Sequence, residues 1–346
     1  MRTLKSGLLA ACAAAMLATP MFAATAKAET KILFNRFVPP KHPFNVGMFI
    51  PWAQDVEKAT DGRVKVEFPT ATLAPPQKQW NMVTSGIADV AMLANAFERK
   101  RLQLPVIAQL PFVGSTAEAR GVALWRTQVE YFDKANEYKG IKLIGAWTLS
   151  GATIYHGSKP ITKAEDLKNE KMWALAGLPN ATLTKFGAVV VSVPGVQMFN
   201  VISKGIVNGF TTSDYSLNSF KVMPYVKYAT RIPGGLNSVS FSLLMNKKKF
   251  DGLTKEDRDA VWSVSGERVA ANAGRKTDEL DQKSIADQKN AGIERLTASP
   301  EFIAQLENGT QFLVDEWLKA AKSRGIDGAA ALDYYKTQAN SVSPSQ

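Results

Sequence analysis

The stretch Ala164-Glu-Asp-Leu-Lys-Asn-Glu-Lys-Met-Trp173 is followed by Phe186-Gly-Ala-Val-Val-Val-Ser-Val-Pro194 and by Lys204-Gly-Ile-Val-Asn-Gly-Phe210. Together they predict two successive β-α steps between Thr153 and Phe210, because short apolar runs alternate there with helical patterns. The same alternation continues through most of the chain. It predicts an α/β fold with mixed sheets.

The size of the chain and the order of its elements predict two lobes. A chain of 346 residues with 45% hydrophobic content can bury a sizeable core. We expect lobe 1 over residues 29–152 and lobe 2 over residues 153–237. An alternating segment at 238–253 predicts a strand that returns to lobe 1, and residues 292–346 are expected to form helices that pack on the lobes.

A long helix is predicted over residues 254–291, which contain no proline and few strand signals. The segment opens with Thr254-Lys-Glu-Asp257, a typical helix N-cap with acidic residues in the first turn. A continuous helix of this length would extend roughly 55 Å at 1.5 Å per residue, enough to cross both lobes. Gly266 and Gly274 each cost about 1 kcal/mol relative to alanine, so a kink or break is compatible with the pattern.

The N-terminus has the features of a signal peptide over residues 1–28. Arg2 and Lys5 precede the apolar run Leu8–Leu17, and Ala26-Lys27-Ala28 is an A-x-A cleavage pattern. The apolar run is too short to span a bilayer, which needs about 20 residues. We therefore expect export, cleavage after Ala28, and a periplasmic protein that does not itself span the membrane.

Cys12 leaves one alternative open. Leu9-Ala10-Ala11-Cys12 resembles a lipobox, so a lipid-anchored product starting at Cys12 is the competing interpretation. Cleavage after Ala28 would instead remove this residue, the only cysteine of the chain, and leave no disulfide or thiol chemistry in the mature protein.

The net charge of +11 raises the question of nucleic-acid binding. The positive charges are scattered, and their densest run, Lys247-Lys248-Lys249, is accompanied by no zinc-finger spacing, no aromatic RNA-binding pattern and no basic helix. We expect no nucleic-acid partner. Moderate positive charge instead affects solubility or docking to a membrane partner.

Few residues of the chain suit catalysis. It has two histidines, His42 and His156, and neither a metal-binding spacing, a glycine-rich phosphate loop nor a G-x-S-x-G elbow. The sequence predicts no catalytic residue, no metal and no cofactor, and hence no enzyme. An exported hydrolase is the alternative class, because paired carboxylates suffice for some hydrolases.

The order and spacing of several short motifs resemble the solute-binding proteins of tripartite ATP-independent periplasmic (TRAP) transporters, the DctP family. The motifs are His42-Pro43, Asp55-Val-Glu-Lys-Ala-Thr-Asp-Gly-Arg63, Gly86-Ile-Ala-Asp89-Val90 and Leu110-Pro111-Phe112, together with the region from Asp166 to Phe210. The resemblance implies a two-lobe binding protein with a hinge. It also implies capture of a small organic solute in an interlobe cleft and delivery of that solute to membrane permease subunits.

The chain departs from the family at the residue that usually binds the ligand. Family members usually have an arginine that clamps the substrate carboxylate, and this chain has Trp173 in that place. Some members have a second arginine at a position that falls near Thr153. A family Glu-Asn pair corresponds approximately to Thr211-Thr212. The chain therefore keeps the family's residues that shape the backbone, while the polar residues that usually bind the carboxylate are replaced.

Two hypotheses for the ligand follow from this departure. In the first, the cleft is an aromatic box in which Trp173 holds an amine or a neutral polar compound, with about 0.5–2 kcal/mol available from cation–π contact. Walls from Phe210, Tyr215 and Phe241 and a counter-charge from Asp214 complete this box. The competing interpretation is that these aromatic side chains simply belong to the core.

In the second hypothesis the ligand is still a small organic acid, such as a monocarboxylate or an aromatic acid. Arg36, at the end of the first predicted strand, then replaces the missing arginine as the carboxylate clamp. A surface position for Arg36 is equally compatible with the sequence.

Overall fold

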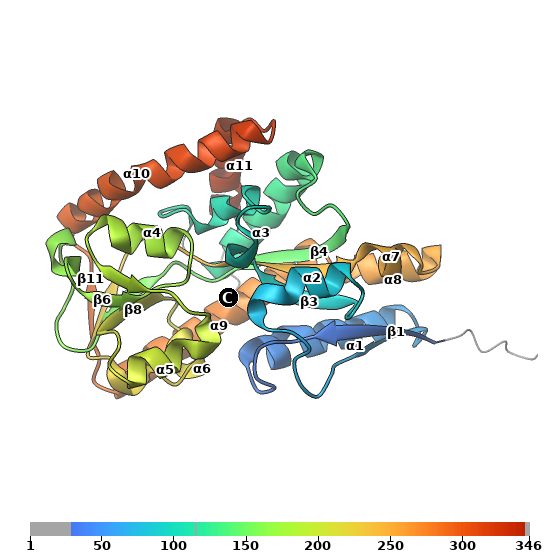
Figure 1. Ribbon diagram of the computed structural model, residues 1–346, viewed down its shortest axis with the longest axis horizontal. Coiled ribbons are helices and arrows are strands. Elements are labelled where there is room, and N and C mark those ends of the chain that lie inside the picture. Colours follow the sequence, from blue (N-terminus) through green and yellow to red (C-terminus); the bar gives the residue numbers. More distant parts are fainter. Residues whose placement is uncertain (1–28, 115, 343–346) are drawn as a thin grey trace, which may run out of the picture.

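The computed structural model describes residues 29–114 and 116–342, which fold into two lobes side by side (Figure 1). The sheet of lobe 1 has the strand order β2-β1-β3-β10-β4. Strand β1 pairs in parallel with β2 and β3, whereas β10 is antiparallel to both β3 and β4. The bounds of these strands are β1 Thr30–Asn35, β2 Val64–Glu67, β3 Val90–Ala94, β4 Ile141–Thr148 and β10 Ser240–Asn246.

The sheet of lobe 2 has the strand order β11-β9-β5-β8-β6-β7. Its central strand β5 is antiparallel to β8 and β9, and the outer pairs are parallel. The bounds are β5 Thr153–His156, β6 Lys171–Trp173, β7 Val189–Val191, β8 Gly209–Thr212, β9 Tyr228–Arg231 and β11 Glu294–Thr297. Mixed parallel and antiparallel pairing in both lobes confirms the predicted fold class.

Helices cover both sheets. Their bounds are α1 Ile50–Ala59, α2 Gln79–Thr84, α3 Ala117–Thr127, α4 Leu178–Lys185, α5 Met198–Ser203, α6 Ser216–Ser219, α7 Lys247–Asp251, α8 Lys255–Ser263, α9 Glu267–Asn290, α10 Pro300–Ser323 and α11 Gly328–Ser341. Figure 1 shows α4, α5 and α6 on lobe 2 and α1, α2 and α3 on lobe 1. None of the helices in the described part of the chain is both long and apolar enough to cross a membrane.

Two extended segments connect the lobes and run beside each other. The segment after β4 and the segment before β10 are joined by hydrogen bonds from Leu149 N to Val239 O (2.9 Å) and from Ala152 N to Asn237 O (2.7 Å). Gly151 and Gly235 lie at their closest approach, where a Cβ on either would come within 2.3 Å of the other's Cα. The crossing therefore requires glycine at both positions.

The predicted long helix is present but interrupted. Thr254 caps α8 by accepting a hydrogen bond from Asp257 N, as the sequence predicts. The helix breaks before α9, where Gly266 adopts a positive φ of +66°. Gly274 does not break α9, because its missing side chain lets the start of α3 pack closely: a Cβ there would lie 2.3 Å from the Cα of Glu118.

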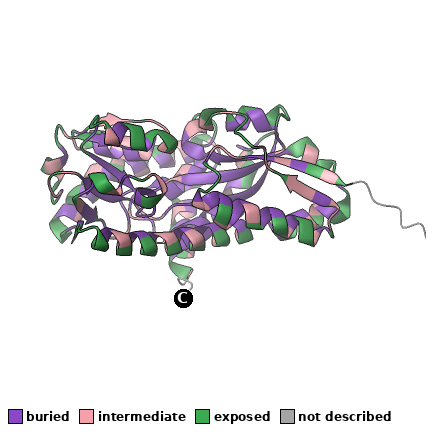
Figure 2. Cartoon of the chain, turned by 90° about the horizontal axis from the view of Figure 1, so that it is seen from below, coloured by how far each residue is buried: buried purple, intermediate pink, exposed green. Residues whose placement is uncertain are grey.

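Helix α9 is the third connection between the lobes. It packs on α3 and β4 of lobe 1, and its Ser284 donates a hydrogen bond to the backbone oxygen of Asp214 in lobe 2 (2.7 Å). Figure 2 shows the long helix along the lower side of the molecule, with buried positions on its inner face and exposed positions outside.

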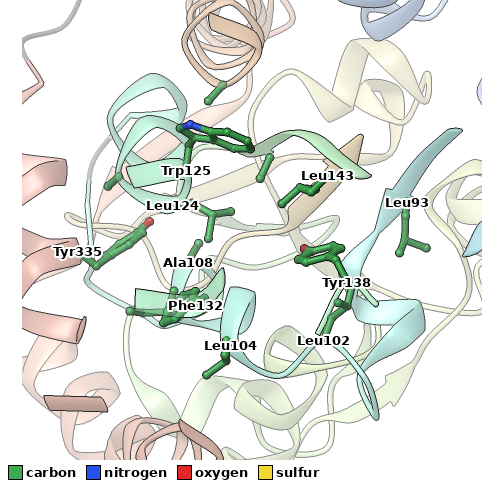
Figure 3. Close-up of a cluster of buried hydrophobic side chains, with 14 of the residues drawn as sticks. Leu93, Leu102, Leu104, Ala108, Leu124, Trp125, Phe132, Tyr138, Leu143 and Tyr335 are labelled. Atoms are coloured by element: carbon green, nitrogen blue, oxygen red, sulfur yellow. The ribbon is translucent and has the colours of Figure 1, made fainter. Parts of the chain in front are cut away.

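The C-terminal helices complete the core of lobe 1. Figure 3 shows this cluster, in which Tyr335 of α11 lies with Leu104, Leu124 and Phe132. The Tyr335 hydroxyl donates to the backbone oxygen of Arg120 (3.1 Å). The predicted signal peptide and Cys12 lie outside the described residues.

Candidate functional site

A cavity lies between the two lobes, with an empty volume of about 610 Å³ that includes its part open to solvent. Lobe 1 lines it with residues after β1 and on β3 and β10, and lobe 2 with the ends of β6 and β8 and the loop before α5. We call it the aromatic cavity, and its lining residues are Phe37, Val38, His42, Phe44, Pro76, Met92, Ala94, Phe97, Leu149, Trp173, Leu175, Pro194, Gly195, Val196, Thr212, Tyr215, Ser216, Phe220, Val239 and Phe241. Within residues 29–114 and 116–342, this lining contains no Lys, Arg, Asp or Glu.

The aromatic walls are fixed by packing against one another. Phe241 of β10 stacks on Trp147 of β4, with ring centroids 5.3 Å apart and an angle of 16° between the planes. Phe44 lies 5.5 Å from Phe241 and 6.0 Å from Tyr215 of lobe 2. Rings at these separations interact favourably. The contact between Phe44 and Tyr215 joins one wall from each lobe.

Trp173 is part of the core and part of the cavity wall. It ends β6, where it pairs with Phe210 of β8, and only 4% of its surface is exposed. Its indole Nε1 donates a hydrogen bond to Val193 O (3.1 Å). The polar edge of the indole is therefore already paired, and the side chain offers an apolar ring surface to a ligand.

His42 is the lining residue with an unpaired polar atom. Its Nδ1 accepts a hydrogen bond from Phe44 N (3.2 Å), which leaves the ring proton on Nε2 in the neutral form. The side chain is buried, and Nε2 has no hydrogen-bond partner among the described residues. Burial lowers the pKa of His42 to about 4, so the imidazole is neutral at neutral pH.

Hydroxyl groups supply the other polar atoms of the lining. Thr212 at the end of β8 donates from Oγ1 to Ser216 Oγ (2.8 Å). Tyr215 lies between them in sequence, and burial raises the pKa of its phenol, which stays neutral. The backbone N–H of Tyr215 donates to Asp281 Oδ1 of α9 (2.6 Å). This bond attaches the lobe 2 wall to the connecting helix.

The structure brings four of the predicted site residues together: Trp173, Thr212, Tyr215 and Phe241 all line the aromatic cavity. Phe210 lies in the lobe 2 core, with its ring 5.1 Å from that of Tyr155. Arg36 lies outside the lining, and its guanidinium carbon is 4.1 Å from the centre of the Phe68 ring.

Thr153 and Asp214 belong to a separate, polar cavity. The buried Asp214 carboxylate accepts hydrogen bonds from Tyr155 Oη (2.5 Å), Gln288 Nε2 (3.0 Å) and Arg295 (2.6 Å). All three bonds are made to Oδ1, and Arg295 compensates the charge of the carboxylate. Asp214 thus already has a cationic partner and lies outside the lining of the aromatic cavity.

Of the aromatic side chains that lobe 1 contributes to the cavity, sequence reasoning named only Phe241, and it gave His42 no ligand-binding role. His42, Phe37, Phe44 and Phe97 line the cavity together with Phe220 of lobe 2. One signal was present: His42 and Phe44 both lie in the proline-containing loop that follows β1. The carboxyl ends of strands in open α/β sheets are where ligands bind.

Two lobes with a hinge and an apolar cavity between them define a binding protein that closes around a small molecule. Residues 34–320 match the model of the family described as bacterial extracellular solute-binding protein, family 7 (DctP). The chain belongs to this family of TRAP transporter solute-binding proteins. These are periplasmic transport proteins and not enzymes, so the predicted family and class are confirmed.

Three relatives show how close the similarity is. The chain is 35% identical over 331 residues to the outer membrane transporter protein TsaT of Comamonas testosteroni, covering 95% of this chain and 97% of that protein. A TRAP periplasmic solute-binding protein of Bordetella bronchiseptica, solved with bound (R)- and (S)-mandelate, has a TM-score of 0.87 at 30% identity and covers 90% of this chain and 99% of that one.

The third is a marine metagenome TRAP solute-binding protein from an unidentified microbe. It is specific for aromatic acid ligands and was crystallised with 3-hydroxybenzoate. It has a TM-score of 0.83 at 26% identity and covers 90% of this chain and 98% of that one.

Proposed function

We propose that this protein binds a small aromatic monocarboxylate in the aromatic cavity and delivers it to the permease subunits of a TRAP transporter. The observation that carries the proposal is the lining itself: aromatic and aliphatic side chains from both lobes, with a few neutral polar groups. Such a lining takes the apolar ring of a ligand and leaves its polar group to a small number of donors. The aromatic acids bound by two similar solute-binding proteins support the same class of ligand.

The lack of a carboxylate among the described residues of the lining counts against the amine of our first hypothesis. A buried ammonium needs a negative partner or several free acceptors. Asp214 is held by Arg295, Tyr155 and Gln288 and lies outside the lining. Trp173 offers a cation–π surface but no charge. The lining is better suited to an aromatic ring than to a cation.

Ligand-dependent thermal stabilisation tests the proposal. A ligand that binds only the folded state stabilises the protein by about 2.7 kcal/mol at a concentration of 100 times Kd. Benzoate and (R)-mandelate should raise Tm in proportion to the logarithm of their concentration, and mass spectrometry should recover them unaltered. Benzylamine is the matched cationic probe. A rise in Tm with benzylamine and none with either acid would contradict the proposal and support the amine hypothesis instead.

A further inference from the structure

One polar group in the aromatic cavity has no hydrogen-bond partner among the described residues. The Nε2 of His42 is buried and unpaired, although buried polar groups in folded proteins are nearly always hydrogen-bonded. Among the residues that line the aromatic cavity, in the described part of the chain, it is the one side-chain polar atom left buried in this way. Leaving a buried donor unpaired destabilises the protein, and an acceptor on a ligand would remove that cost.

The position of the ring is fixed, so Nε2 is presented in one place. Phe44 N–H holds Nδ1 at 3.2 Å. The ring centroids of Phe44, Phe220 and Tyr215 lie 5.0, 5.9 and 6.4 Å from that of His42. Two of these neighbours belong to lobe 2, so His42 lies where the two lobes meet. A ligand ring between these walls would lie beside the His42 side chain.

We propose that the Nε2–H of His42 donates a hydrogen bond to the carboxylate of the bound aromatic acid. This inference rests on the proposed function. His42 then replaces, from lobe 1, the arginine that family members carry at the Trp173 position in lobe 2. The neutral imidazole supplies a donor without a charge. The hydroxyls of the lining belong to Thr212, Tyr215 and Ser216, and that of Thr212 already donates to Ser216 Oγ. A hydrogen bond to a charged group is worth about 1.5–3 kcal/mol, roughly a tenfold to hundredfold change in affinity.

Paired substitutions separate this role from a structural one. His42→Asn keeps an acceptor for Phe44 N–H and loses the donor at Nε2, whereas His42→Gln keeps a donor near Nε2 and loses that acceptor. We expect His42→Asn to weaken benzoate binding by about tenfold or more and His42→Gln to weaken it by less. Benzamide has the same ring, but its neutral carbonyl accepts a weaker hydrogen bond from Nε2–H, so its binding should be weakened less than that of benzoate.

His156→Asn is the matched control. The Nδ1 of His156 also accepts from the backbone N–H two residues later, that of Ser158 (3.2 Å), but His156 lies outside the aromatic cavity. Its affinity for benzoate should equal that of the wild type. If His42→Asn weakens benzoate and benzamide equally, or weakens neither, the proposed hydrogen bond is excluded.

A second measurement does not depend on any variant. The chain has two histidines, so ¹⁵N-histidine NMR shows two imidazole rings. Benzoate should shift the Nε2 resonance of His42 and leave that of His156 in place; equal spectra with and without bound benzoate would overturn the inference. If the wild type binds no aromatic acid at all, the proposed function itself fails, and this inference with it.

Discussion

Trp173 gives the lobe 2 wall both its shape and part of its stability. Its Nε1 is hydrogen-bonded to Val193 O and only 4% of its surface is exposed. The side chain is therefore buried more deeply than one that only lines a cavity. The structure places Trp173 at the end of β6, within the motif region from which the sequence predicted a ligand-binding position. Replacement of the usual arginine by Trp173 removes a charge from the cavity and adds apolar surface.

Substitution of Trp173 should therefore affect binding and stability together. Trp173→Ala should weaken benzoate binding by about 1–3 kcal/mol through lost ring contact. It should lower the free energy of unfolding by about 3–5 kcal/mol, as for other buried aromatic truncations. Isothermal titration and chemical denaturation measure the two effects.

Trp173→Phe is the control, because it keeps an aromatic ring while it loses the bond to Val193 and part of the indole volume. It should retain most of the benzoate affinity. Full affinity in Trp173→Ala would show that the indole ring does not contact the ligand.

The residues that sequence reasoning could not place share a physical reason. Whether a side chain faces the cavity depends on the direction of its Cα–Cβ bond and on its neighbours, which short motifs do not record. Arg36 and Phe37 are adjacent in sequence, yet Arg36 lies on Phe68 and Phe37 lines the cavity. Asp214 and Tyr215 are also adjacent in sequence, yet Asp214 lines the polar cavity and Tyr215 lines the aromatic cavity.

At the scale of elements, the long helix shows what local signals can and cannot decide. Thr254 begins α8 as predicted, because capping depends on residues within one turn. Two glycines were candidates for a break, and only Gly266 makes one. Gly274 stays helical because α3 packs against it, a tertiary contact that no local propensity reveals.

The crossing of the two connecting segments is sensitive to an added methyl group. Gly151→Ala would place a Cβ 2.3 Å from the Cα of Gly235, so the paired segments would have to separate. Overpacking of this kind typically costs about 1–3 kcal/mol. We expect a lower Tm in thermal unfolding.

Gly121→Ala is the matched control for this substitution. Its Cβ would meet atoms of Ala270, Thr148 and Trp147 at the ordinary contact distances of 3.4–3.5 Å. The position lies inside α3, where alanine is favoured over glycine. Gly121→Ala should leave Tm unchanged or raise it, and equal losses in both variants would contradict close packing at the crossing.

At the scale of the whole molecule, the sequence predicted two lobes and a connecting helix, because these follow from the order of strands and from segment lengths. It did not predict how the connections are coupled. Asp281 of α9 accepts hydrogen bonds from Ser150 Oγ (2.5 Å) in the segment between β4 and β5 and from Tyr215 N (2.6 Å) in lobe 2. One carboxyl group thus links all three parts, although they are far apart in sequence.

The stability of this junction should depend on pH. Burial, with added repulsion from Asp214 and Asp278, raises the pKa of Asp281 from 3.8 to about 8. Between about pH 3.8 and about pH 8, the folded state therefore binds one proton more than the unfolded state. The stabilisation from this group is complete below about pH 4 and is lost as the pH rises through about 8, with a slope of up to about 1.4 kcal/mol per pH unit.

Asp281→Asn removes this titration while keeping an acceptor for Tyr215 N. Relative to the wild type, the variant should become steadily more stable as the pH rises from 5 to 9. Chemical denaturation across this range measures the difference. Asp287→Asn, an exposed change on the same helix, is the control and should show no such upward trend. A difference that does not vary with pH would mean that Asp281 stays ionised, and that the junction carries a fixed buried charge rather than a proton.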